Sequence, residues 1–186
     1  MEKILEIAEL GHPILREMAA QVKNLEDEEI QNFIDNLIAT AIEANGVGIA
    51  APQVYESKRI FIISSRPNER YPNAPEMEPT AIINPEILSF SEEKEKDWEG
   101  CLSIPGIRGL VPRHKSINVK YLTRNGEEVE SEFSDFIARI FQHELDHLNG
   151  TVFLDRMESS LEIITEKEYQ RLISKAMEEM DLENEG

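Results

Sequence analysis

The sequence contains a single cysteine among its 186 residues, so no disulfide can form within the chain. One thiol favours a reducing compartment, because small secreted domains commonly depend on disulfides. No apolar run approaches the ~18 residues of a membrane span, and the longest one is Ile60–Ile63. The start of the chain carries Glu2 and Glu6, where a signal peptide would have basic and then unbroken apolar residues. We therefore expect a cytoplasmic protein.

Basic residues are also scarce. The chain has 19 Lys and Arg against 37 Asp and Glu, which gives a formal net charge of −18. A surface this negative repels phosphate backbones and anionic lipid, so neither a nucleic acid nor a membrane is an expected partner. Hydrophobic residues make up 40% of the chain, which is enough for a folded core. The length suits one domain over residues 1–186.

Periodicity indicates both helices and strands, in segregated rather than alternating order, so the expected class is α+β. A helix is predicted from Leu25 to Asn45, and a second over Phe136–Asn149 with Ser134 or Asp135 as its cap. A C-terminal helix is predicted within 160–182, beginning near Thr165 and packing an apolar stripe on the domain. Strands are predicted over 58–64, 80–90 and 107–134, with a tight turn at Asn125-Gly126, and the proline-rich residues 66–79 are expected at the surface.

The second predicted helix contains His143-Glu144-Leu145-Asp146-His147. Two histidines four residues apart project from one face of a helix and can hold one metal ion, with the intervening glutamate placed to move protons. Apolar residues share that face and the adjoining one, so the histidines are expected to point inward. Only Arg139, Gln142, Asp146 and Asn149 are expected to form a polar back to this helix.

Cys101 is the candidate third ligand. It lies in Glu99-Gly100-Cys101-Leu102-Ser103, just before a predicted strand. A Cys-His-His set leaves one position open for water, as in catalytic zinc sites. A nucleophilic Cys–His pair is an alternative, but it leaves the second histidine and Glu144 without a role. A closed structural zinc site is another, and it would need a fourth ligand, for which only His12 and His114 remain among the histidines.

A third motif is Gly46-Val47-Gly48-Ile49-Ala50-Ala51-Pro52-Gln53. It fits a loose dinucleotide-binding pattern, but it follows a predicted helix rather than a strand, and Pro52 is poorly placed to open a helix. We interpret the stretch as a strand whose glycines let another backbone approach closely, with Gln53 as an amide donor at its end.

Together these three motifs resemble the peptide deformylase family, whose motifs run Gly-x-Gly-hydrophobic-Ala-Ala-x-Gln, Glu-Gly-Cys-hydrophobic-Ser and Gln-His-Glu-x-Asp-His in this order. Further similarity covers His12-Pro13 and Leu110–Arg113, so that the match extends over roughly residues 10–157. The resemblance implies small antiparallel or mixed sheets around a buried central metal-binding helix, with a C-terminal helix. Residues 68–79 resemble a surface insertion present in part of the family.

The resemblance implies a hydrolase that removes the N-terminal formyl group from formyl-methionyl nascent chains and releases formate. It assigns the metal to Cys101, His143 and His147, with metal-bound hydroxide attacking the formyl carbon and Glu144 as general base and then acid. The Gln53 side chain and the Leu102 N–H would stabilise the oxyanion. Cysteine and histidine ligands alone would indicate zinc, whereas the resemblance implies Fe²⁺, with Zn²⁺, Ni²⁺ or Co²⁺ able to substitute.

The resemblance also suggests where substrate and partners bind. The peptide is expected to pair as a strand with Val47, Gly48 and Gly100, and its methionine side chain to lie near Phe136, Arg139 and Ile140. Arg113 and Asp146 are candidates for a buried pair, with Glu99 nearby. Some members dock on the ribosome through a basic C-terminal helix, but residues 158–186 here carry a net charge of −6, so that contact is not expected. A monomeric enzyme of the bacterial cytoplasm is predicted.

Overall fold

The computed structural model describes residues 2–184, with side-chain surroundings through residue 178. All paired strands in this part of the chain are antiparallel and form two sheets. The larger sheet has the order β1-β2-β3-β6-β7, with bounds Gly48–Ala50, Ile60–Ile63, Thr80–Phe90, Ser116–Leu122 and Glu128–Ser134. The smaller has the order β4-β5-β8, with bounds Lys94–Cys101, Ile104–His114 and Ile163–Thr165. The α-helices are α1, Glu28–Glu43, α2, Asp135–Leu148, and α3, Glu166–Asn184, and short 3-10 turns cover Pro13–Arg16, Ala51–Val54, Phe153–Arg156 and Ser160–Glu162.

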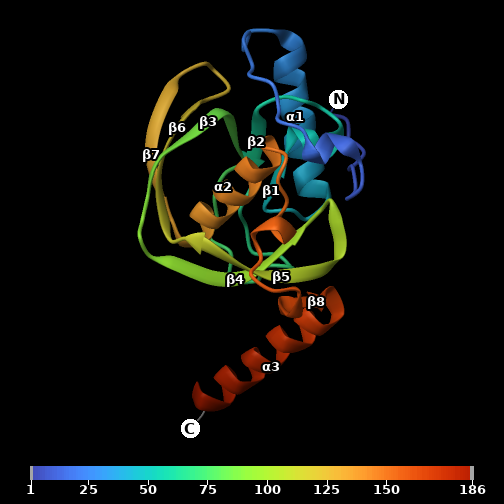
Figure 1. Cartoon of the computed structure of the whole chain (residues 1–186), viewed down its shortest axis with the longest axis vertical. Helices are drawn as coiled ribbons and strands as arrows, with labels where there is room; N and C mark the ends of the chain where they lie inside the picture. The colour runs from blue at the N-terminus through green and yellow to red at the C-terminus, as the bar shows by residue number, and fades with distance from the viewer. Residues whose placement is uncertain (1, 185–186) are drawn as a thin grey trace.

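The longest apolar run of the sequence forms β2, which lies between two helices. Side chains alternate across a strand, so Phe61 and Ile63 pack in the cluster that contains α2, while Ile60 and Ile62 pack in the cluster that contains α1. All four are fully buried. In Figure 1, α2 lies at the centre of the molecule with the strands around it and α1 to one side. The predicted α+β fold with a buried central helix is confirmed.

Most predicted element boundaries agree with the structure to within a few residues. α1 begins at Glu28 rather than Leu25, because the Asp27 side chain caps it by accepting from the Glu29 N–H, and Asn45 takes the left-handed conformation after it (φ 51°). Gly126 has a φ of +83° in the predicted tight turn between β6 and β7. Two register shifts interrupt β3. The predictions missed β8 and the charged strand β4.

The predicted polar back of α2 is wrong for three of its four residues. Arg139, Gln142 and Asp146 are each less than a tenth exposed. Gln142 bonds through its side chain to both the N–H and the carbonyl of His114 in β5, and the other two residues enter a network of buried ion pairs. The smaller sheet therefore covers a face of α2 that would otherwise be solvated.

The C-terminal helix begins at Glu166, as predicted near Thr165, and the Glu168 N–H donates to Thr165 Oγ1. Residues 160–165 form a 3-10 turn and β8, which pairs with Ile107–Gly109 of β5. The expected packing of an apolar stripe is limited to the first turn, because Tyr169 is buried whereas Leu172 and Met177 are about half exposed. The side chain of Met180 lies outside the described residues. Figure 1 shows α3 projecting away from the sheets.

None of the helices in residues 2–184 combines the length and apolar character needed to cross a bilayer.

Candidate metal centre and active site

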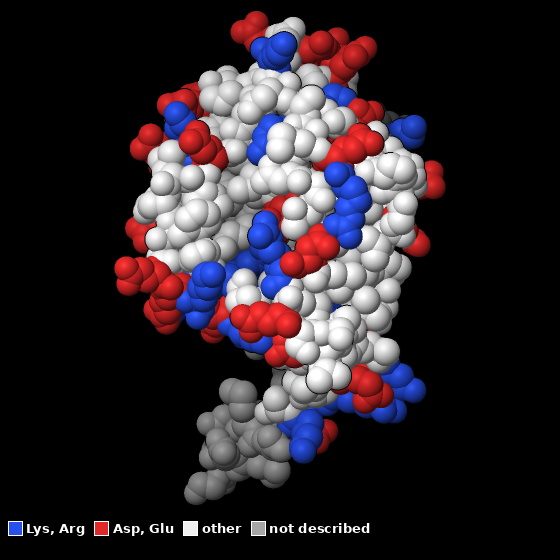
Figure 2. All heavy atoms as spheres, in the orientation of Figure 1, with Lys and Arg blue, Asp and Glu red and all other residues white. Residues whose placement is uncertain are grey.

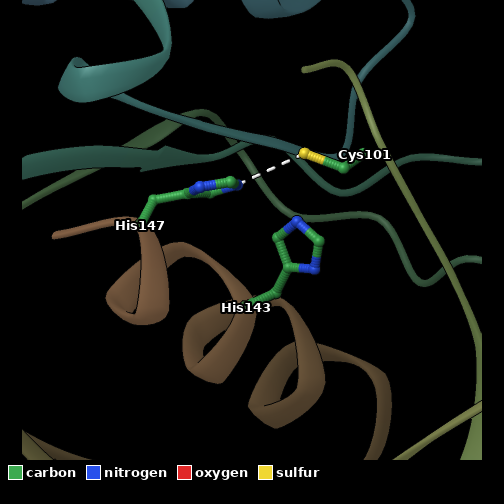
Figure 3. Close-up of side chains that lie close together, drawn as sticks. All are labelled: Cys101, His143 and His147. Atoms are coloured by element: carbon green, nitrogen blue, oxygen red, sulfur yellow. Dashed lines mark hydrogen bonds between the residues drawn. The ribbon is translucent and has the colours of Figure 1, made fainter. Parts of the chain in front are cut away.

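Cys101, His143 and His147 meet at the centre of the fold, as Figure 3 shows. The two histidines project from the same face of α2, and Cys101 lies at the end of β4, which runs beside that face. Cys101 Sγ is 3.3 Å from His147 Nε2, and one ligand atom from each residue lies within 4.8 Å of the others. His147 is fully buried and Cys101 is 4% exposed. One thiol and two imidazoles thus converge from two elements far apart in the sequence.

The chemistry of these donors fits a bound divalent transition metal. His143 Nδ1 lies 2.9 Å from Glu99 Oε2, which fixes the ring and leaves Nε2 as the ligand atom. His147 Nδ1 is buried with no hydrogen-bond partner among the described residues. A buried thiol between two histidines, with one position left over, is the donor set of an open rather than a closed site.

The other two histidines lie elsewhere. His114 Nδ1 contacts the Ser91 carbonyl at 2.7 Å, and His12 Nδ1 accepts from the Ile14 N–H. Within the described residues the ligand group therefore consists of three side chains and has no fourth histidine. This arrangement argues against the structural zinc alternative.

Burial and hydrogen bonding shift the pKa values of the two histidines in opposite directions. Burial alone would lower the pKa of His143, but hydrogen bonds to Cys101 and Glu99 raise it well above its ordinary value. Burial lowers the pKa of His147 well below its ordinary value, and the positive charges of His143 and Arg113 add to the effect. His147 is therefore neutral at physiological pH, which is the form that can coordinate a metal, whereas His143 would release its proton when a metal binds.

Glu144 lies beside the ligand group in a nearly water-free position. Its side chain is 4% exposed and its Oε2 has no hydrogen-bond partner among the described residues. Burial raises the pKa of Glu144 to about 7. The carboxyl group lines the same cavity as Cys101 and His143. A carboxyl group poised near neutral pH suits proton transfer.

Gly48 leaves the space that Glu144 occupies. A Cβ at this position would lie 2.6 Å from Glu144 Oε1. We expect Gly48→Ala to reduce kcat roughly 10- to 100-fold, because the added methyl displaces the carboxylate by up to about 1 Å. The measurement is formate release from formyl-Met-Ala-Ser, a substrate of the class that the resemblance implies. Gly48→Ala should cause no further loss in a Glu144→Gln background; an equal loss in both backgrounds would contradict this explanation.

Gln53 is held at the ligand group by three hydrogen bonds. Its Oε1 accepts from the Ala50 N–H (2.9 Å), and its Nε2 donates to Ser103 Oγ (3.1 Å) and Cys101 Sγ (3.4 Å). These contacts orient the amide nitrogen toward the cavity that Leu102 also lines. The strand predicted through this motif is confirmed for β1, after which Ala51–Val54 turn as a 3-10 helix.

A buried ion network supports His143 from behind, and the predicted pair of Arg113 and Asp146 belongs to it. Arg113 donates to both oxygens of Glu99 (2.8 and 3.0 Å) and to Asp146 Oδ2 (2.6 Å). Burial opposes ionisation of Glu99, but the charge of Arg113 lowers the pKa of Glu99 well below its usual range. Arg156, which the sequence analysis missed, donates to both oxygens of Asp146. The network fixes the carboxylate that orients His143.

The predicted substrate residues all border one cavity: Val47, Gly48, Gly100, Phe136, Arg139 and Ile140. In the orientation of Figure 1, the surface drawn in Figure 2 has a hollow near its middle, and acidic and basic side chains lie around it. Arg139 contributes its stem rather than a free charge, because its guanidinium donates to Glu99 Oε1 and to the Val111 and Glu95 carbonyls.

Sequence reasoning missed Arg70, Tyr71 and Trp98, which also line the cavity. The first two lie in the proline-rich loop and Trp98 in the charged strand β4, so no periodic pattern marked them.

Three comparisons with known proteins show which family this chain is similar to. The family model described as polypeptide deformylase matches residues 4–162. Peptide deformylase 2 of Nostoc sp. strain PCC 7120 is 60% identical over 173 residues, which cover 93% of this chain and 97% of that protein. Peptide deformylase 2 of Shewanella oneidensis is 47% identical over 83% of this chain and 84% of its own length.

Solved structures agree. The Met-Ala-Ser-bound class I type b peptide deformylase of Acinetobacter baumannii superposes with a TM-score of 0.82 at 52% identity, covering 84% of this chain and all of that one. The actinonin complex of a peptide deformylase from Synechococcus elongatus gives 0.76 at 35% identity, over 87% and 86% of the two chains. The motifs, the ligand geometry and these relatives agree: the chain belongs to the polypeptide deformylase family, whose enzymes remove the formyl group from the N-terminus of peptides.

Proposed function

We propose that the chain is a single-domain hydrolase that removes the formyl group from N-formylmethionyl peptides and releases formate at the site formed by Cys101, His143, His147 and Glu144. The observation that carries this proposal is the convergence of three buried ligand atoms within 4.8 Å, in a cavity that Glu144 also lines. The two relatives named Peptide deformylase 2 support the reaction.

Cys101 Sγ, His147 Nε2 and His143 Nε2 would hold the metal. A divalent cation bound there supplies Lewis acidity, which lowers the pKa of a coordinated water and polarises the formyl oxygen. Fe²⁺ is our proposal for the physiological ion, with Zn²⁺, Ni²⁺ or Co²⁺ as substitutes. Cysteine and imidazole ligands are compatible with all four ions, so metal analysis of protein purified without oxygen is needed to identify the ion.

Glu144 would handle the protons. Its carboxylate accepts a proton from the attacking water, and the same oxygen later delivers that proton to the departing methionine nitrogen, so that the C–N bond breaks and a neutral amine leaves. The Leu102 N–H, and the Gln53 Nε2–H that points to Cys101 Sγ before substrate binds, would donate to the oxyanion that forms on the formyl oxygen. The hydrogen bonds of Gln53 to Ala50 and Ser103 support this assignment, because they hold its amide before substrate arrives.

The peptide would bind as an added strand between the two sheets. β1 is one of the two edge strands of the larger sheet, and β4 is one of the two edge strands of the smaller sheet. Gly48 lies in β1 and Gly100 in β4, and both residues border the cavity together with Val47. Unpaired edge backbone binds an extended peptide without regard to its side chains, which suits an enzyme that processes many nascent chains. Phe136, Ile140 and the Arg139 stem would contact the methionine side chain.

The net charge of −18 supports an enzyme that acts without direct nucleic-acid contact. We propose a monomer in the bacterial cytoplasm that does not bind the ribosome through α3.

The test is release of the free amine of Met-Ala-Ser from formyl-Met-Ala-Ser by protein purified without oxygen, with acetyl-Met-Ala-Ser as the matched substrate and formate measured in addition for the formyl peptide. We expect hydrolysis of the formyl peptide only, because the acetyl group is one methyl larger and the cavity wall at Glu144 and Gly48 is already tightly packed. Comparable hydrolysis of both peptides would contradict the proposed site, and no hydrolysis of either would contradict the proposed function.

A further inference from the structure

Arg108 is a fully buried arginine that the metal centre does not use. It lies in the middle of β5 at 0% exposure. Gly100 of β4 lies beside it, since a Cβ there would make an ordinary van der Waals contact of 3.5 Å with Arg108 Cγ. A charge this deeply buried persists only where its surroundings compensate the lost hydration.

Two tyrosine rings, one carboxylate and one carbonyl provide most of that compensation, and Nη1 has no hydrogen-bond partner among the described residues. The Arg108 guanidinium lies 4.7 Å from the Tyr71 ring centroid and 3.9 Å from that of Tyr169. Its Nε and Nη2 donate to the two oxygens of Glu166 at 2.8 and 3.1 Å. Nη2 also donates to the Arg70 carbonyl at 3.2 Å. Arg108 thus joins three segments that are distant in sequence, namely β5, the 66–79 loop and the first turn of α3.

A second contact joins α3 to the 66–79 loop. Gln170 Nε2 of α3 donates to the Glu69 carbonyl of the loop at 3.3 Å. The loop residues Glu69, Arg70 and Tyr71 therefore rest on α3 and on Arg108, and not only on the sheets.

Tyr71 connects the Arg108 cluster to the cavity, because it contacts Arg108 and also lines the cavity. Its hydroxyl oxygen accepts from the Gly100 N–H at 3.4 Å, and its ring centroid is 5.2 Å from that of Phe136. Both rings line the cavity that contains Glu144 and Cys101. The position of Tyr71 therefore sets one wall of the space beside Phe136.

We propose that Arg108 is a positioning residue for substrate binding. It holds Tyr71 as a wall of the methionine pocket, and Glu166 and Tyr169 of α3 hold Arg108 in place. The proposal rests on the proposed placement of the substrate in this cavity. It gives the C-terminal helix a role in substrate affinity that involves no ribosome contact. Arg108 touches neither the ligand group nor Glu144, so its loss should affect binding rather than the chemical step.

The test is a double-mutant cycle between Arg108→Lys and Tyr71→Ala, with kcat and KM measured for formyl-Met-Ala-Ser. Lysine keeps the charge but loses the planar face and the bidentate fork. We expect each single variant to raise KM about 5- to 10-fold with kcat within about twofold, and the double variant to resemble Tyr71→Ala alone. Quenching of Trp98, the only tryptophan, gives an independent binding constant for Met-Ala-Ser, because Trp98 lines the cavity and contacts Tyr169.

Arg171→Ala is the matched control, since Arg171 pairs with Glu168 on the exposed side of the same helix. It should leave KM and the Trp98 binding constant unchanged. Additive effects in the cycle, or an unchanged KM in Arg108→Lys, would overturn the proposal. If Arg108→Lys does not fold, Glu166→Gln and Tyr169→Leu test the same link from α3, and an unchanged KM in both would overturn it. Inactive wild-type protein would instead contradict the proposed function.

Discussion

Glu144→Gln should lower kcat for formyl-Met-Ala-Ser by about 10²- to 10⁴-fold while leaving the bound metal in place. The amide has the shape of the carboxyl group but cannot accept a proton from water or return one to the leaving amine. Glu144 does not belong to the group of convergent ligand atoms, so its loss removes no ligand. Formate release and metal content, measured on the same preparation, separate the two roles.

Asp135→Asn is the control for this substitution. It makes the same acid-to-amide change at the exposed start of α2, and asparagine tolerates the positive φ of 52° found there. Its rate should match the wild type. If Glu144→Gln keeps more than about a tenth of the wild-type rate, well above what loss of a general base allows, Glu144 does not carry the proton.

Cys101→Ala should release the metal and with it the activity. The substitution removes the only sulfur ligand and leaves two histidine nitrogens, one of them His147 Nε2, which lies 3.3 Å from Sγ. We expect at least about a 100-fold loss of metal affinity, since removing even a hydrogen-bond partner of a ligand costs 10- to 100-fold. Metal per chain after dialysis is the measurement, with competition against a chelator for the affinity.

Ser103→Ala serves as the comparison for Cys101→Ala. Ser103 is also fully buried in the turn after β4, yet it contacts Gln53 rather than the ligand atoms. It should retain a full complement of metal. Equal metal content in Cys101→Ala and the wild type would remove the cysteine from the ligand set.

The sequence predicted the centre of the fold well, because local patterns encode it. His143 and His147 share a face by helical spacing alone, and the apolar run Ile60–Ile63 is typical of a strand buried on both sides. Cys101 is a candidate third ligand from its donor chemistry, and the resemblance assigns it to the histidines, since nothing local to either segment brings β4 against α2. The structure supplies that contact.

The missed features depend on long-range pairing. Arg108 carries a charge in a strand, and no local pattern reveals that Tyr71 and Tyr169, from two other segments, enclose it. β8 exists because β5 offers it an edge, so residues 163–165 carry only a weak strand signal of their own. The apolar stripe on α3 has helical periodicity, but beyond the first turn its described residues Leu172 and Met177 are about half exposed. Periodicity alone cannot show whether another part of the chain covers such a stripe.

The central claim is that one metal centre and one carboxylate perform the reaction together. The most direct measurement is formate released per second per bound metal ion, for wild type and Glu144→Gln purified side by side without oxygen. We predict about one metal ion per chain in both proteins, because the site has one ligand group, and a rate per metal that is about 10²- to 10⁴-fold lower in the variant. Equal rates per metal in the two proteins would contradict the account.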